Sequence, residues 1–190
     1  MFEAFTRPAI DSFNQAIKEA HNFGFLEMSN HDILLAILVT VPSRNPFISI
    51  LNKYNITESN VRKLILKKVP YEKKGIRKPQ VPLGEVKFSL ECQQLVNECY
   101  AVSNNFRHEY VSIAHIILAI IQPSQVNTYA YQIVDDLLEE LPYIVDLNML
   151  REDITDKIRA EDEEMASYNI SDIISSEDLL DGQFEKTRKE

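Results

Sequence analysis

An internal repeat is the feature of this sequence that most constrains its fold. When the sequence is shifted by about 83 positions, it matches itself without any insertion. The strongest match places residues 33–37 (ILLAI) on residues 116–120 (IILAI). The same shift also aligns Phe5-Thr6 with Phe88-Ser89, Asn22-Phe23 with Asn105-Phe106, and Ser29 with Ser112. Because repeated units of this kind bury their apolar faces against each other, the sequence predicts a pseudo-twofold pair packed into one domain.

Each copy is predicted to form helices, because its apolar residues recur three and four positions apart. In the first copy, Thr6 is expected to cap the first helix, with Pro8 in its first turn and Gly24 at its end. Asn30 is expected to cap a second helix, in which residues 33–39 are apolar on every face. A helix of this kind must be surrounded by its neighbours, so we expect it at the centre of the unit.

Capping residues and breakers place the other helices. The expected caps and breakers are Asn45, Asn55, Thr57 and Pro70 in the first copy and Ser89, Ser112 and Asn127 in the second. A last helix is expected near residues 147–158, and no strand is expected. The predicted fold class is therefore all-α, a pseudo-twofold pair of four-helix repeats with about eight helices and an acidic C-terminal tail.

The chain is predicted to divide into a repeat domain over residues 1–160 and an acidic tail over residues 161–190. Within the domain we expect repeat one at 1–70, a linker at 71–87 and repeat two at 88–160. The linker is basic and rich in proline, which favours an extended, solvated connector over a nucleic-acid contact. The tail mixes Asp and Glu with a few Ile and Leu, so two alternatives stay open. It forms one or two helical turns that dock on a partner, or it folds back or stays disordered.

The net charge of −9 disfavours a nucleic-acid partner, because proteins that bind phosphate backbones present basic faces. No stretch approaches the roughly 18 apolar residues of a membrane span, and no secretory signal is visible. Cys92 and Cys99 lie about 10 Å apart along one predicted helix, which is too far for a disulfide. We expect reduced core thiols, hence a cytoplasmic protein, or one of the plastid stroma if the chain is processed.

These residues resemble the tandem Clp repeat, the N-terminal domain of AAA+ unfoldases of the ClpC and ClpA type. The opening MFEAFTRPAI is similar to the start of that domain, and SNHDILLAIL and SIAHIILAII are similar to its repeated signature Gly-Thr-Glu-His-Ile-Leu-Leu-Gly-Leu. In ILNKYNIT, Asn55 stands at the position of a family glycine. The resemblance covers residues 1 to 158 and implies a domain that docks substrates or adaptors of the Clp proteolytic system.

The resemblance also implies candidate partner-binding residues, namely Phe2, His31, Asp32 and His115. Phe2 matches an N-terminal aromatic of a binding surface, with packing of the N-terminus onto the first helix as the alternative. His31 and Ala114 stand where the family has two glutamates that recognise phosphoarginine. Alanine cannot accept hydrogen bonds and neutral imidazole offers one acceptor, so phosphoarginine binding is expected to be weak or lost. For His31 we otherwise expect a capping or surface role, and for His115 a hydrogen-bonded structural role.

No catalytic apparatus is predicted. The sequence contains no Gly-Lys dipeptide, so the phosphate-binding loop of ATPases is missing and the chain is expected to stand alone without ATPase modules. No cofactor or metal site is expected, because neither the histidines nor the cysteines show ligand spacing. We also expect no membrane partner.

Two functions remain after these exclusions. The first is a non-enzymatic accessory or adaptor protein of a Clp chaperone–protease system, which would bind a Clp ATPase, a ClpP-type core or a substrate. The alternative is a Clp-repeat scaffold reused for a partner unrelated to proteolysis.

Overall fold

The computed structural model describes the backbone of residues 1–70 and 82–186 and the side chains of residues 1–70 and 82–167. Two compact units are present, Met1–Ile154 and Thr155–Glu190. Most of the predicted linker, residues 71–81, lies outside the described residues. The predicted boundary between domain and tail at residue 160 stays a prediction.

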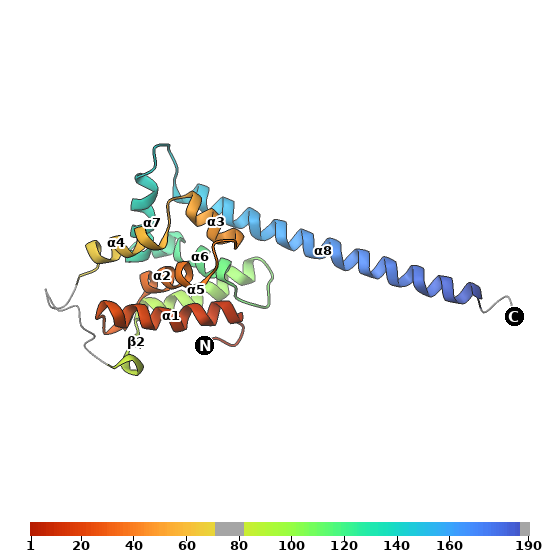
Figure 1. The fold of residues 1–190 in the computed structure, drawn as a ribbon, viewed down its shortest axis with the longest axis horizontal. Helices are drawn as coiled ribbons and strands as arrows, with labels where there is room; N and C mark the ends of the chain where they lie inside the picture. Colours follow the sequence, from red (N-terminus) through yellow and green to blue (C-terminus); the bar gives the residue numbers. More distant parts are fainter. Residues whose placement is uncertain (71–81, 187–190) are drawn as a thin grey trace. The chain divides into compact units, whose positions relative to one another are not determined.

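Eight α-helices lie in the described part of the chain, four in each copy of the repeat (Figure 1). The first copy contains α1 (Arg7–Phe23), α2 (Asn30–Thr40), α3 (Pro46–Lys53) and α4 (Glu58–Lys68). The second copy contains α5 (Leu90–Asn105), α6 (Ile113–Ile120), α7 (Tyr129–Glu139) and α8 (Leu147–Lys186). The predicted all-α class and the duplication of a four-helix unit are confirmed.

Most of the predicted capping residues lie at helix starts, and two predictions are wrong by one residue. The N-cap of α2 is Ser29 rather than Asn30, because the Asp32 carboxylate accepts the Ser29 backbone N–H at 2.9 Å. The N-cap of α7 is Thr128 rather than Asn127, and its hydroxyl accepts the Tyr131 N–H at 3.2 Å. In both cases the first turn is fixed by a hydrogen bond between a side chain and the backbone N–H of a residue three positions away.

The expectation of no strand is also wrong, because two short strands pair in parallel. Strand β1 (Glu27–Met28) precedes α2, and β2 (Lys87–Phe88) precedes α5. Glu27 pairs with Lys87 and Met28 pairs with Phe88. Two residues are too few to show the alternation by which a strand is recognised in a sequence. The C-terminal end of the predicted linker over 71–87 therefore carries ordered structure.

The two copies exchange their entry segments. The Ser89 N–H donates to the Met28 carbonyl at 3.0 Å, and the Thr6 N–H donates to the Val111 carbonyl at 2.9 Å. The two bonds are related by the same sequence shift that aligns the copies, and a bridge between Phe5 and Val111 corresponds to the pair Met28 and Phe88. The segment before the first helix of each copy thus pairs with the segment before the central helix of the other.

The left-handed residues follow the same symmetry. Gly24 ends α1 with a φ of 81°, and Arg107, which aligns with it in the second copy, has a φ of 59°. Glycine adopts this region without steric cost, whereas a residue with a Cβ rarely does. The left-handed backbone conformation is therefore retained in the second copy, although arginine stands there in place of glycine. Asn55, the predicted left-handed residue, has a φ of 65°.

The core is built around α2 and α6. Every residue from 33 to 37 and from 116 to 120 is at most 2% exposed. Helix α2 contacts α1 and α4 of its own copy and α5, α6 and α7 of the other. The prediction of a central helix surrounded by its neighbours is confirmed. Cys92 and Cys99 are free thiols buried in α5, and burial raises the pKa of Cys92 to about 12, which makes it unreactive at neutral pH.

Helix α8 continues well beyond the predicted end of the repeat. Its backbone is helical from Leu147 to Lys186. The sequence predicted a helix near 147–158, followed by a tail that either forms one or two helical turns or folds back or stays disordered. Residues 159–167 (RAEDEEMAS) contain neither glycine nor proline, so nothing in that stretch ends the helix. The side chains beyond residue 167 are outside the described part, and docking of the tail stays a prediction.

An aromatic cluster joins the two copies beside the exchanged segments. The ring of Phe5 lies 5.0 Å from Phe2, 5.7 Å from Phe13 in α1 and 5.5 Å from Tyr100 in α5, measured between centroids. Phe88, which aligns with Phe5, lies 5.9 Å from Phe2. These rings are held in edge-on arrangements, which add to the energy of burial.

Replacing Phe5 by alanine is therefore expected to destabilise both copies together. Phe5 is 7% exposed, and loss of a buried ring lowers the free energy of unfolding by about 3 kcal/mol. Urea denaturation followed by circular dichroism should show one transition shifted as a whole. Tyr143→Ala, at a site 52% exposed, is the control and should change the free energy by less than about 0.5 kcal/mol. Two separate unfolding transitions, only one of which shifts in Phe5→Ala, would contradict a core shared by the two copies.

Candidate functional site

The two signature sequences form equivalent helix starts with different chemistry. At the start of α2, the Asp32 carboxylate accepts the Ser29 N–H at 2.9 Å. At the start of α6, Nδ1 of His115 accepts the Ser112 N–H, also at 2.9 Å. A carboxylate and an imidazole thus fill the same capping position, third in the helix. Both side chains satisfy a backbone donor that the helix leaves without a partner.

His115 is a hydrogen-bonded structural residue, as predicted. Its side chain is buried, and because Nδ1 accepts a backbone proton, Nε2 carries the ring proton when the imidazole is neutral. Nε2 lies 2.9 Å from Nδ1 of His108, which is the acceptor in that tautomer. The rings of Phe106 and Tyr110 lie within 6 Å of His115. Both nitrogens of His115 are therefore engaged inside the domain.

His31 and Asp32 form a buried pair at the start of α2. His31 is 4% exposed and Asp32 is fully buried, and the cap is supplied by Asp32, so the capping or surface role expected for His31 is wrong. Nε2 of His31 lies 3.4 Å from Oδ2 of Asp32, between the rings of Phe25 and Tyr129. Burial lowers the pKa of His31 to about 4, which leaves it neutral at pH 7.

The same burial raises the pKa of the Asp32 carboxyl well above its usual range. The Ser29 hydrogen bond acts against this increase, and the negative charges of Glu19 and Glu91 add to it. Burial also raises the pKa of Glu91, whose carboxyl accepts the Asn30 backbone N–H. Removing charge from water costs free energy, so both members of the His31–Asp32 pair favour their neutral forms.

A hydrogen bond missed by the sequence analysis crosses from one copy to the other beside this pair. Nδ2 of Asn30 donates to Oε1 of Gln125 at 3.0 Å, and both side chains are buried. The two residues are separated by 95 positions, and no local pattern marks either one. The start of α2 is therefore a polar, fully enclosed contact between the copies.

The burial of these residues limits what they can offer to a partner. His31, Asp32 and His115 lie inside the domain, whereas Phe2 is half-buried and packs on Phe13 of α1 at 4.8 Å. This packing is the alternative role that the sequence left open for Phe2. The partner-binding role of all four residues stays a prediction.

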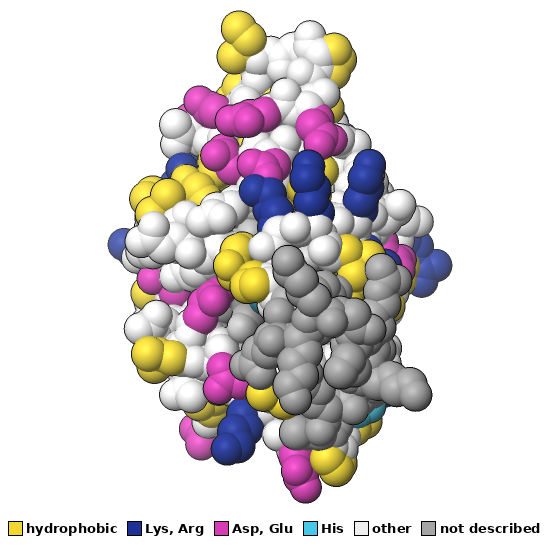
Figure 2. Space-filling view, turned by 90° about the vertical axis from the view of Figure 1, so that its left-hand side faces the viewer, with side chains coloured by type: hydrophobic (Ala, Val, Ile, Leu, Met, Phe, Trp, Pro, Cys, Tyr) yellow, Lys and Arg dark blue, Asp and Glu magenta, His cyan; other side chains and the backbone are white. Residues whose placement is uncertain are grey.

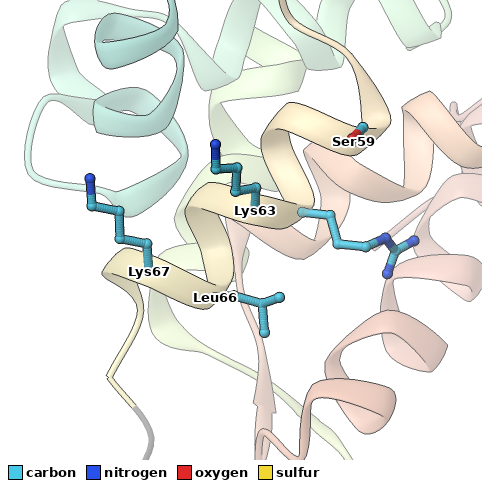
Figure 3. A pocket seen from close by; sticks show the side chains of 5 residues that line it. Ser59, Lys63, Leu66 and Lys67 are labelled. Carbon is cyan, nitrogen blue, oxygen red and sulfur yellow. The ribbon is translucent and has the colours of Figure 1, made fainter.

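The exposed surface with a distinct character lies on α4. Ser59, Arg62, Lys63, Leu66 and Lys67 line a shallow depression there, which we call the α4 face (Figure 3). Lys63 and Lys67 extend in the same direction from successive turns, and Leu66 extends from the adjoining side of the helix (Figure 3). The sequence predicted this helix from its cap and its breaker alone, so this surface was not predicted, although the four-residue spacing of Lys63 and Lys67 is visible in the sequence.

The cationic side chains of α4 differ in whether they have ion-pair partners. Arg62 binds Glu19 of α1 at 2.9 Å and Glu58 at 3.1 Å, and Lys68 pairs with Asp136 of α7. Lys63 and Lys67 are exposed, and among the described side chains neither has an ion-pair partner. Figure 2 shows the Lys and Arg side chains as a row over α4, with Asp and Glu side chains gathered over α7 beside it.

No group of three or more His, Cys, Asp or Glu in the described part of the chain is placed to hold a metal ion. No helix among residues 1–70 and 82–186 is both long and apolar enough for a transmembrane segment.

The comparisons with known proteins agree with this architecture. The sequence matches the family "Clp repeat (R) N-terminal domain" over residues 4–133. The N-terminal domain of the caseinolytic protease associated chaperone ClpD from Arabidopsis thaliana superimposes with a TM-score of 0.62 at 18% identity, covering 84% of this chain and 97% of that one. The Hsp104 N-terminal domain from Candida albicans gives a TM-score of 0.57 at 18% identity, covering 80% and 89%. A search of curated proteins found no match.

The buried pair predicts an unusual pH dependence. The lowered pKa of His31 and the raised pKa of Asp32 act in opposite directions on the pH dependence of stability, because the folded protein binds protons more weakly at His31 and more strongly at Asp32 than the unfolded chain does. The two shifts therefore offset each other in the native sequence. Asp32→Asn removes the carboxyl, and the lowered pKa of His31 then acts alone. The free energy of unfolding of Asp32→Asn should rise by about 3 kcal/mol from pH 4 to 6.5, more steeply than that of the native sequence.

Urea denaturation at a series of pH values measures this difference. The stability that His31 contributes is fully present above pH 6.5 and is lost as the pH falls toward 4. The control is the double variant His31→Gln/Asp32→Asn, in which the slope should disappear. Equal slopes for Asp32→Asn and the double variant between pH 4 and 6.5 would show that the pKa of His31 is not lowered in the folded protein.

Proposed function

The chain belongs to the Clp repeat N-terminal domain family, and from this premise we propose that it is a non-enzymatic accessory or adaptor protein of a Clp chaperone–protease system. Domains of this family are protein-interaction modules of Clp chaperones. Its partner would be a Clp ATPase, a ClpP-type protease core or a substrate. The match over residues 4–133, which covers α1 to α6 and the start of α7, is the observation that carries the proposal.

The distribution of polar groups supports a binding role without chemistry. The titratable residues at the starts of α2 and α6 are enclosed, and their hydrogen bonds serve the helix starts and the contact between copies. The exposed features are surfaces, such as the α4 face and the loop after α7, where Ile144 is 98% exposed. A protein of this kind acts by tethering, which raises the effective concentration of one partner near another.

One observation favours the alternative of a scaffold reused for another partner. His31 and Ala114 replace the two signature glutamates, and both are buried. A domain that has lost the ligand contacts of its family can retain the fold for a different partner. We propose a reducing compartment, cytoplasm or plastid stroma, in either case, since Cys92 and Cys99 are free.

Affinity capture from the host tests the proposal. The full chain used as bait should enrich Clp ATPase or ClpP-type subunits by about tenfold over an unrelated acidic helical protein of similar size, as counted by mass spectrometry. A second bait that ends at residue 160 shows whether the tail takes part in docking. Recovery of an unrelated partner and of no Clp subunit would favour the reused scaffold.

Phosphoarginine should bind weakly or not at all. Ala114 has no acceptor, and the one acceptor of neutral His31 is buried. In calorimetric titrations with a phosphoarginine peptide, the double variant His31→Glu/Ala114→Glu should bind at least about tenfold more tightly than the native sequence. Circular dichroism checks that both proteins are folded. Micromolar binding by the native sequence would contradict this expectation.

A further inference from the structure

We propose that the α4 face docks an acidic segment of a partner protein that carries a large aliphatic side chain. This inference rests on the proposed function, because it names the chemistry of a partner that such a binding module would take. It is carried by the placement of one exposed leucine on the same helix as two lysines that lack ion-pair partners among the described residues.

The α4 face is held in place by the opposite side of the same helix. Val61, Leu64 and Ile65 are buried, and α4 contacts α2 in its own copy and α7 in the other. Thr57 caps the helix through the Asn60 N–H, and the pair of Arg62 with Glu19 links the helix to α1. The side chains of the α4 face therefore project from a rigid support, which reduces the entropy lost when a partner binds.

Leu66 gives the surface an apolar centre. Its side chain is 40% exposed, and it extends from the side of α4 that adjoins Lys63 and Lys67 (Figure 3). The aliphatic stems of Lys63 and Lys67 extend the apolar area around it. An aliphatic side chain of a partner would remove this area from water, which is how small hot spots gain binding energy.

The charges of the α4 face favour a partner segment that is negatively charged. Glu19 and Glu58 neutralise Arg62, and Asp136 neutralises Lys68. Lys63 and Lys67 remain as two cations without a carboxylate within ion-pair distance in the described residues. Carboxylates spaced to reach both lysines, on either side of an aliphatic residue, would complement this arrangement.

A protein segment fits this surface better than a nucleic acid does. The whole chain carries a net charge of −9, and acidic side chains gather over α7 directly beside the basic row (Figure 2). A continuous phosphate backbone would run into this negative region, whereas a peptide can place its acids only where the lysines are. Leu66 contributes nothing to a phosphate contact.

Fluorescence anisotropy with the full chain tests the proposal directly. The probe is a labelled helical peptide of about 14 residues, with Leu at every third or fourth position and Glu elsewhere. We expect saturable binding that weakens as salt is raised. Lys63→Glu/Lys67→Glu should lower the affinity by about tenfold or more, and Leu66→Ser by about fivefold.

Lys18→Glu/Lys87→Glu is the matched control, because it makes the same change in charge at two exposed lysines that belong to α1 and β2 rather than to α4, and it should bind like the native sequence. Equal binding by the native chain and Lys63→Glu/Lys67→Glu, both folded by circular dichroism, would overturn the proposal. Equal binding of a probe with Ser in place of Leu, or of an oligo-dT, would also overturn it, since charge alone would then explain the contact. If light scattering shows that the native chain self-associates and that Lys63→Glu/Lys67→Glu does not, the α4 face binds a second copy of this chain. The proposed acidic partner segment would then be wrong.

The outcome of this peptide-binding test can be distinguished from the outcome of the affinity capture that tests the proposed function. If both the native chain and Lys63→Glu/Lys67→Glu capture Clp subunits while the peptide does not bind, the α4 face is wrong and the Clp role stands. If the peptide binds through Lys63, Leu66 and Lys67 while no Clp subunit is captured, the docking surface stands and the Clp role is wrong.

Discussion

The fold depends on apolar surface that neither repeat can bury alone. Helix α2 packs on three helices of the other copy, and the entry segments are exchanged through the bonds from Ser89 to Met28 and from Thr6 to Val111. Each copy thus completes the small parallel pairing of the other. The aromatic cluster around Phe5, which includes Tyr100 of α5, and the contact of α4 with α7 belong to the same packing of the two copies.

The duplicated helix starts show how the same backbone accommodates different chemistry. Asp32 and His115 each satisfy the backbone donor at the N-cap, yet the first lies in a neutral acid–base pair with His31 and the second in a histidine pair with His108. Enclosed polar groups of this kind fix one arrangement of the copies, since a displaced partner would leave a buried donor or acceptor unsatisfied. Specificity for other proteins is therefore left to exposed surfaces such as the α4 face.

The sequence predicted the features that local patterns encode. The match of residues 33–37 with 116–120 indicated the duplication, and hydroxyl and amide side chains marked most helix starts. It could not predict features that arise only from tertiary contact. Two-residue strands have no alternation to detect, and the bond between Asn30 and Gln125 joins residues distant in sequence. The burial of His31 was not predicted, because a polar residue at a helix start is commonly exposed. Here the second copy of the repeat covers it.

Covalent linkage of the copies has a consequence for their behaviour on dilution. Two identical chains that exchanged segments in this way would form a dimer and would separate at low concentration. In the tandem arrangement the second copy is always available at the high local concentration set by the connecting residues. The assembled domain is thus insensitive to the concentration of the protein in the cell.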